Sequence, residues 1–158
     1  MRQILLIVDV QSTFSPPSWL VAGITNLIER MPSIATIELH DEAHTPFQRQ
    51  LGWRPAAQDT CLVMPDQVFV KHGYMPPAQA LAYLRRFNPD RVLVCGVQTE
   101  TCVLAAGFAL FDVGLHPTLV TDLTVGSSLD RSGQLGIRLW EHHFRNTVLS
   151  DELLAGFD

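Results

Sequence analysis

The 158 residues of the chain suffice for one domain that buries about two-thirds of the surface exposed by the unfolded chain. Hydrophobic residues make up 47% and charged residues 17%, and with a mean hydropathy of +0.15 this composition excludes long disorder. A net charge of −5 without any run of Lys or Arg argues against a nucleic-acid partner, and no apolar run approaches the ~20 residues that span a membrane.

Apolar runs alternate with segments of helical periodicity along the whole chain. The first run, Ile4–Val8, is typical of a central parallel strand, and Asp9 interrupts it before the core of a signal peptide could form. Further strands are predicted at Ile34–Leu39, Val68–Val70, Val92–Cys95, Thr118–Thr121 and Thr147–Leu149. Helices are predicted at Leu20–Met31, from Pro76 to Phe87, from Thr101 to a stop before Gly114 and at Ser127–Phe144, and a terminal turn or helix is predicted at Asp151–Leu154.

This alternation predicts an α/β fold. We expect a single three-layer α/β/α, Rossmann-like domain over residues 1–158, with a mostly parallel central sheet of five or six strands. The least regular segment is His40–Asp66, which is long for a connection inside a compact domain and is therefore expected to be either functional or disordered. Its aromatic and polar residues, among them Phe47 and Trp53, favour a lid or a pocket wall. Arg54 is expected to pair with an acid of its own loop rather than with a substrate carboxylate.

The stretch Arg91–Val103 reads as a strand that stops at Gly96 and then turns into a helix. Cys102 falls in the first turn of that helix. There the unpaired backbone N–H groups and the helix dipole favour a thiolate over a thiol. The alternative is that Cys102 is only a small apolar residue that packs the helix against the sheet.

Three side chains of reactive type follow predicted strands. They are Asp9 after the first strand, Lys71 after the third and Cys102 after the fourth. In a parallel sheet, ligands bind outside the carboxyl ends of the strands, so these residues are expected to meet at one edge. Each alone has a structural explanation, but a nucleophilic cysteine needs a base and a positive neighbour, and Asp9 and Lys71 can supply both.

Four motifs then identify a family. LLIVDVQSTF opens the chain, FVKHGY lies in its middle, and VLVCGVQTETCV is followed by LVTD. In these motifs the sequence resembles the isochorismatase-like superfamily of cysteine hydrolases, which includes nicotinamidases, N-carbamoylsarcosine amidohydrolases and isochorismatases. The resemblance implies a catalytic triad. Asp9 would exchange the proton, Lys71 would hold the thiolate and orient the carboxylate, and Cys102 would attack a carbonyl to form an acyl-enzyme.

The resemblance also implies a non-proline cis peptide bond between Val97 and Gln98. Its expected role is to aim the backbone N–H of Gln98, together with that of Cys102, at the oxyanion. Phe14 matches an aromatic residue that lines the substrate pocket in the family. The residues expected to contact substrate are Phe14, Gln11, Trp53 and Thr101, the last of which occupies a position that is often His in nicotinamidases.

One departure from the family concerns metal binding. Nicotinamidases carry an Asp-x-His motif and a further His that bind a metal near the pocket. Here His40, Asp41 and His44 follow a strand, but in a different order and spacing. We therefore expect an ordinary loop at this place, with no metal and no other cofactor.

The leading prediction from the sequence is a cofactor-independent hydrolase that cleaves an amide-like C–N bond of a small molecule. Alternatives are an isochorismatase-like ether hydrolase, a non-catalytic small-molecule-binding or assembly subunit of the same fold, and a thiol redox protein. The apolar composition and the family habit favour a homo-oligomer, a dimer or a tetramer. Three cysteines that cannot all pair favour the reducing cytoplasm. No feature of the sequence names the substrate.

Overall fold

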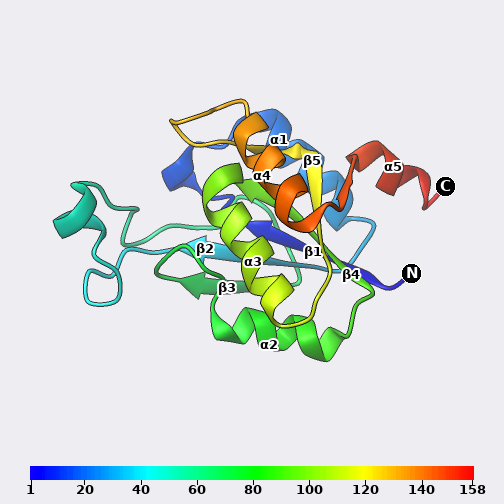
Figure 1. Ribbon diagram of the computed structural model, residues 1–158, viewed down its shortest axis with the longest axis horizontal. Coiled ribbons are helices and arrows are strands. Elements are labelled where there is room, and N and C mark those ends of the chain that lie inside the picture. The colour runs from blue at the N-terminus through cyan, green and yellow to red at the C-terminus, as the bar shows by residue number, and fades with distance from the viewer.

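A computed structural model describes residues 1–158. Six strands and five α-helices alternate along the chain (Figure 1). The strands are β1 (Gln3–Val8), β2 (Ser33–Glu38), β3 (Gln67–Lys71), β4 (Arg91–Val97), β5 (Pro117–Val125) and β6 (Thr147–Val148). The α-helices are α1 (Ser18–Ile28), α2 (Ala78–Phe87), α3 (Leu104–Asp112), α4 (Gln134–Phe144) and α5 (Ser150–Ala155). A 3₁₀ turn, η1 (Ser12–Phe14), and two π-helical turns, η2 (Phe47–Leu51) and η3 (Thr99–Val103), complete the structure.

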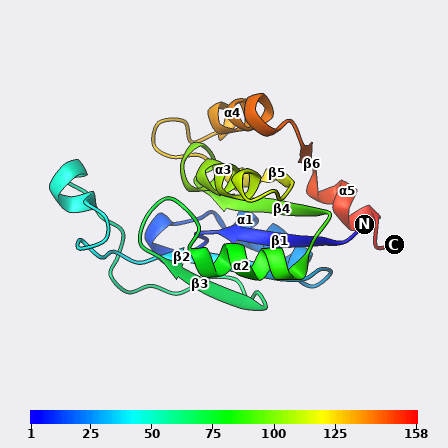
Figure 2. The same cartoon turned by 60° about the horizontal axis from the view of Figure 1, so that its bottom comes forward.

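The strands form one parallel sheet in the order β3-β2-β1-β4-β5-β6. Helices α2, α3 and α4 pack on one face, and α1 and α5 pack on the other, which gives the three layers visible in Figures 1 and 2. The predicted α/β/α fold is confirmed, with six strands in the sheet. No helix is both long and apolar enough to cross a membrane.

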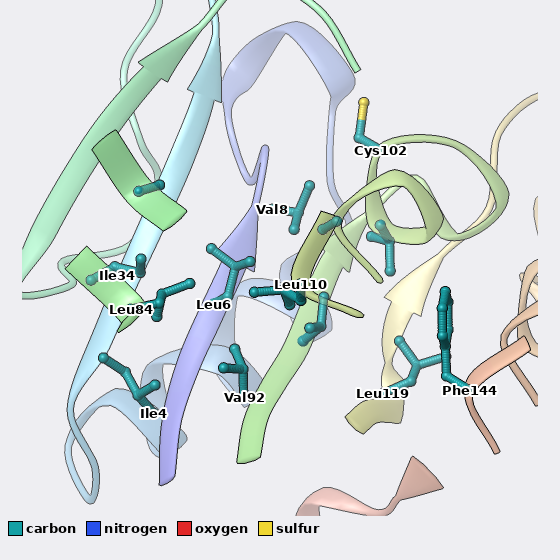
Figure 3. Packing of buried hydrophobic residues seen from close by; sticks show 14 of the residues in the cluster. Ile4, Leu6, Val8, Ile34, Leu84, Val92, Cys102, Leu110, Leu119 and Phe144 are labelled. Carbon is teal, nitrogen blue, oxygen red and sulfur yellow. The ribbon is translucent and has the colours of Figure 1, made fainter. Parts of the chain in front are cut away.

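The central strand β1 feeds both cores, because successive side chains of a strand point to opposite faces. Ile4, Leu6 and Val8 belong to the cluster under α2, α3 and α4, whereas Leu5 and Ile7 belong to the cluster under α1 and α5. All five are at most 1% exposed, so the strand is buried on both faces as its continuous apolar run predicts. Figure 3 shows the first cluster, with Cys102 at its edge beyond Val8.

The order of the strands creates a switch point between β1 and β4. From β1 the chain builds outward to β2 and β3 on one side and later to β4, β5 and β6 on the other. Such a reversal opens a crevice at the carboxyl ends of the strands. At this end β4 approaches β1 so closely that a Cβ on Gly96, where φ is +111°, would lie 2.2 Å from the carbonyl oxygen of Val8. Only glycine fits this position.

Two predicted helices begin three or more residues later than expected. The helix expected from Ser127 begins at Gln134, because the chain before it runs through Gly126 and through Gly133, which has φ of +80°. The helix expected from Thr101 is preceded by η3, and α3 proper starts at Leu104. The irregular segment between β2 and β3 contains η2 and projects from the body of the molecule in both views (Figures 1 and 2).

Candidate active site

The carboxyl ends of the strands bring the three expected reactive residues together. Lys71 is the last residue of β3, Asp9 follows β1, and Cys102 lies in η3 after β4. Their exposed fractions are 3%, 0% and 5%. Lys71 Nζ lies 2.9 Å from Asp9 Oδ2, which makes a buried ion pair, and an Asp9 carboxylate oxygen lies within 4.8 Å of Cys102 Sγ. The three side chains therefore form one contiguous polar site.

The ion pair is fixed from both sides. Thr36 Oγ1 donates a hydrogen bond of 2.9 Å to Asp9 Oδ1, and Lys71 Nζ donates one of 3.0 Å to the carbonyl oxygen of Tyr74. Burial raises the pKa of Asp9 above its ordinary value, although Lys71 opposes this shift. Burial alone would lower the pKa of Lys71, but the negative charge of Asp9 outweighs burial and raises it. Lys71 therefore keeps a positive charge beside the sulfur.

Cys102 differs from the sequence-based expectation in its protonation. Burial raises its pKa well above the ordinary thiol value, and the negative charge of Asp9 adds to this, while Lys71 opposes it. Cys102 lies in the π-helical turn η3, immediately before α3, and not within α3 itself. The resting residue is a neutral thiol, and its proton has to leave during the reaction rather than before it.

A fourth polar residue, which the sequence did not single out, lies at this edge. Glu38 ends β2, is paired with Lys71 in the sheet register, and is 2% exposed. Its carboxylate lies within 4.8 Å of ligand atoms of both Asp9 and Cys102. Burial raises its pKa to about 7, with Lys71 opposing and Asp9 adding to the shift. An acid at the carboxyl end of the apolar run IATIEL was the signal available in the sequence.

The turn between β4 and η3 follows next. The peptide bond between Val97 and Gln98 is cis. The Gln98 carbonyl oxygen accepts hydrogen bonds from the N–H groups of Thr101 (3.0 Å) and Val103 (3.2 Å), whereas the Gln98 N–H donates to no acceptor within the protein. Val97 is buried in the core under α1 and α5, so its side chain shapes the turn and does not face a ligand.

A hollow of about 440 Å³ lies beside this turn. Phe14, Trp53 and Gln98, three of the residues expected near substrate, line it together, and the ring centroids of Phe14 and Trp53 are 6.3 Å apart. Arg131, which the sequence did not single out, is the only charged residue of the lining. Thr101 lies elsewhere, in an apolar hollow along α3. Phe14, Trp53 and Gln98 thus share one wall, and Thr101 does not.

Gln11, which was expected to contact substrate, lies instead against the backbone of β2. It is wholly buried, and its side-chain amide is occupied by the backbone of Glu38: Oε1 accepts from the Glu38 N–H at 2.6 Å and Nε2 donates to the Glu38 carbonyl oxygen at 2.8 Å. Nε2 also lies 3.0 Å from Asp59 Oδ2. With its donors and acceptor engaged, Gln11 positions Glu38 and does not line the hollow.

The segment between β2 and β3 makes its own small aromatic cluster. Phe47 contacts Trp53 and Tyr74 edge-on, with ring centroids 5.9 Å and 5.5 Å away, and Phe47 is buried by these contacts. The expected ion pair of Arg54 is absent. Glu42, one of the acids of this segment, instead pairs with Arg49 at 2.8 Å. Arg54 is an exposed side chain without an ionic partner.

The residues considered for metal binding are partly regrouped. Asp41 and His44 lie together, and His72, which follows Lys71, joins them with ligand atoms within 4.8 Å of one another. His40 lies apart and contacts Glu42 at 3.3 Å. Asp41 Oδ2 and His44 Nδ1 already bind each other at 2.7 Å, and His72 Nδ1 lies 2.8 Å from the carbonyl oxygen of Leu39. These three side chains could hold a cation, but none of them belongs to the Asp9–Lys71 pair.

Comparison with known proteins identifies the family. The sequence model of the family described as the isochorismatase domain matches residues 3–152, and the chain therefore belongs to the isochorismatase family. The family expected from the sequence motifs is confirmed, and with it the class of enzyme, a hydrolase. No curated protein sequence matches the chain significantly.

Solved structures share the fold at low sequence identity. A nicotinamidase/pyrazinamidase of Acinetobacter baumanii is 17% identical with a TM-score of 0.79, and the match covers 96% of this chain and 98% of the other. N-carbamoylsarcosine amidase of Thermoplasma acidophilum is 18% identical with a TM-score of 0.78 and the same two coverages. PnC1 of L. infantum, solved in complex with nicotinate, is 19% identical with a TM-score of 0.75, and the match covers 95% and 93% of the two chains.

Proposed function

We propose that the protein is a cysteine hydrolase that cleaves an amide-like C–N bond of a small molecule through an acyl-enzyme on Cys102. The observation that carries this proposal is the buried ion pair of Lys71 and Asp9, 2.9 Å long, beside the Cys102 thiol. A nucleophile, a proton acceptor and a fixed positive charge are the groups that thiol-based acyl transfer needs. The similarity to proteins named nicotinamidase and N-carbamoylsarcosine amidase supports the C–N bond as the target.

The reaction begins with proton transfer inside the site. Asp9 takes the proton of the Cys102 thiol as the sulfur attacks the substrate carbonyl carbon, and Lys71 stabilises the negative charge that develops on sulfur. The C–S bond forms while the carbonyl π electrons move onto oxygen. The free N–H of Gln98 and the N–H of Cys102 are the donors assigned to this oxyanion.

The tetrahedral intermediate then collapses. Asp9 returns its proton to the leaving nitrogen, the C–N bond breaks, and an amine or ammonia departs from a thioester on Cys102. A water molecule enters, loses a proton to Asp9 and attacks the thioester carbonyl. When the C–S bond breaks, the sulfur regains the proton from Asp9, the acid product leaves, and the thiol is restored.

The substrate is proposed to occupy the hollow of Phe14, Trp53 and Gln98. A volume of about 440 Å³ suits a small molecule, and two aromatic side chains of the lining suit a flat or apolar acyl group. The neighbouring structure with bound nicotinate supports a small organic ligand in this fold. No observation favours the ether-hydrolase alternative, and a complete trio of Asp9, Lys71 and Cys102 gives no reason to choose a non-catalytic role.

The redox alternative is disfavoured by the environment of the sulfur. A redox-sensing cysteine needs an exposed thiol of low pKa, and Cys102 is 5% exposed with a raised pKa. Because the thiol has to stay reduced for catalysis, we place the reaction in a reducing compartment, the cytoplasm.

We further propose a homo-oligomer, a dimer or a tetramer. Apolar side chains stay exposed along α3 and the loop facing it: Met75 is 50% exposed, Phe108 37% and Phe111 57%. Together with Leu104, the first two line an apolar hollow that a second copy of the chain would cover. Light scattering after size exclusion should give a mass of two or four chains, and a monomer at micromolar concentration would contradict this.

The hydrolase proposal is tested by kinetics on a panel of small primary amides. Ammonia release should be catalysed by the wild-type protein and reduced to background by Cys102→Ala. The matched control is Cys61→Ala, which removes a half-buried thiol that the proposed mechanism does not use and should leave turnover unchanged. Equal activity of Cys102→Ala and wild type would refute the proposed nucleophile.

A further inference from the structure

The carboxyl group of Glu38 is a part of the site that the proposed mechanism does not use. In the order of the sheet it lies between Lys71 at the end of β3 and Asp9 after β1. It is 2% exposed, and its Oε1 is buried without any hydrogen-bond partner in the protein. A buried polar atom without a partner is costly, and such atoms mark places where a ligand completes the hydrogen bonding.

The backbone holds this carboxyl group in place. Gln11 binds both the N–H and the carbonyl oxygen of Glu38, and Asp59, which accepts from Gln11 at 3.0 Å, is anchored by Thr13 at 2.6 Å through Oγ1 and 2.8 Å through the backbone N–H. The wholly buried Gln11 and the loop carboxylate of Asp59 thus fix the end of β2. The side chain of Glu38 is therefore aimed into the site by a built framework and not by chance.

The charges around Glu38 favour its neutral form. The titratable groups that face it are Lys71, Asp9, Cys102 and Tyr74. Only Lys71 is positive, and it is already paired with Asp9 at 2.9 Å. A second buried carboxylate would have no counter-ion of its own, and it would oppose thiolate formation at Cys102. The neutral carboxyl group instead presents an O–H donor that has no acceptor within the protein.

We infer that Glu38 binds the substrate directly, donating a hydrogen bond from its neutral carboxyl group to a second acceptor atom close to the scissile carbonyl. This inference rests on the proposed amide hydrolysis and adds a substrate class to it. The favoured substrates are small amides that carry a hydroxyl or carbonyl oxygen, or a ring nitrogen, within one or two bonds of the reacting carbon. An amide without such an acceptor leaves the buried donor unpaired when it binds.

The test compares isosteric pairs of amides that differ only in this acceptor, such as glycolamide with propionamide and picolinamide (pyridine-2-carboxamide) with benzamide. The wild-type protein should favour the acceptor-bearing member by about tenfold in kcat/KM, the size expected when one buried donor loses its partner. Glu38→Gln keeps a donor and should keep the preference, whereas Glu38→Met has no donor and should bring the ratio near one. Glu42→Gln, a nearby acid paired with Arg49, is the matched control and should change nothing.

The pH profile separates this role from a purely structural one. For acceptor-bearing amides, wild-type kcat/KM should fall as pH rises above about 7, where Glu38 ionises, and Glu38→Gln should lack this fall. Thermal unfolding of each variant verifies that it is folded. An unchanged preference in folded Glu38→Met would overturn the inference while leaving the hydrolase intact. Absence of any turnover that depends on Cys102 would instead remove the proposed function on which it rests.

Discussion

The buried carboxyl group of Glu38 makes a quantitative prediction about stability. Its pKa is about 7 in the folded protein, against an ordinary value of 4.5 that applies to the unfolded chain. Below pH 4.5 both states are protonated and the group has no effect. Between pH 4.5 and 7 only the unfolded chain ionises, so the free energy of unfolding falls as pH rises and levels off above pH 7.

The size of this effect follows from the two pKa values. Their difference, at about 1.36 kcal/mol for each pH unit, corresponds to about 3 kcal/mol of stability lost between pH 4.5 and pH 8. Glu38→Gln cannot ionise and is free of this loss. Relative to wild type, its free energy of unfolding should therefore rise by about 3 kcal/mol over the same interval, whatever the effect of the substitution at low pH.

Urea unfolding of both proteins at a series of pH values measures the difference directly. In thermal unfolding the same effect should appear as a change of roughly 6–12 °C in the difference between the two melting temperatures. Glu42→Gln, which removes an acid outside the site, is the control and should not reproduce it. A difference between Glu38→Gln and wild type that stays constant from pH 4.5 to pH 8 would refute the placement of Glu38 in a buried, negatively charged site.

Three further substitutions test the geometry of the site. Lys71→Met leaves Asp9 as an unpaired buried carboxylate and should lower the free energy of unfolding, measured in urea, by about 3–5 kcal/mol. The double variant Asp9→Asn/Lys71→Met should regain most of that stability without regaining activity. Additive losses of stability in the double variant would contradict the ion pair. Thr36→Val removes the hydrogen bond to Asp9 Oδ1 and should lower kcat by about tenfold with little change in KM, as measured by ammonia release; an effect on KM alone would point to substrate binding. Gly96→Ala places a methyl group 2.2 Å from the Val8 carbonyl oxygen and should lower the melting temperature by roughly 10 °C or more, whereas an unchanged value would show that β4 does not approach β1 so closely.

Most of what could be predicted about the site came from the residues that follow the predicted strands in the sequence. Asp9, Lys71 and Cys102 were found because each is a reactive residue that follows an apolar run, and parallel strands bring such positions to one edge. Glu38 obeys the same rule, yet an acid that ends a strand is most often solvated. Only the register of β2 against β3, which places Glu38 beside Lys71, shows that it is buried.

Other features depend on contacts between distant segments. The bonds of Gln11 to the Glu38 backbone join residues 27 positions apart, and no local pattern encodes them. The raised pKa of Cys102 follows from its burial and from the nearby negative charge of Asp9. The position of Arg131 in the hollow depends on the loop before α4, where glycines replace the expected helical turns.

The most direct test of the central claim is the intact mass of the protein, quenched in acid during turnover of an amide that it hydrolyses. The mechanism predicts a mass increase equal to the acyl group of that amide, located by peptide mapping on Cys102 and absent from Cys102→Ala. In Cys61→Ala the adduct should persist. Turnover without any covalent adduct on Cys102, or an adduct on another residue, would contradict the account.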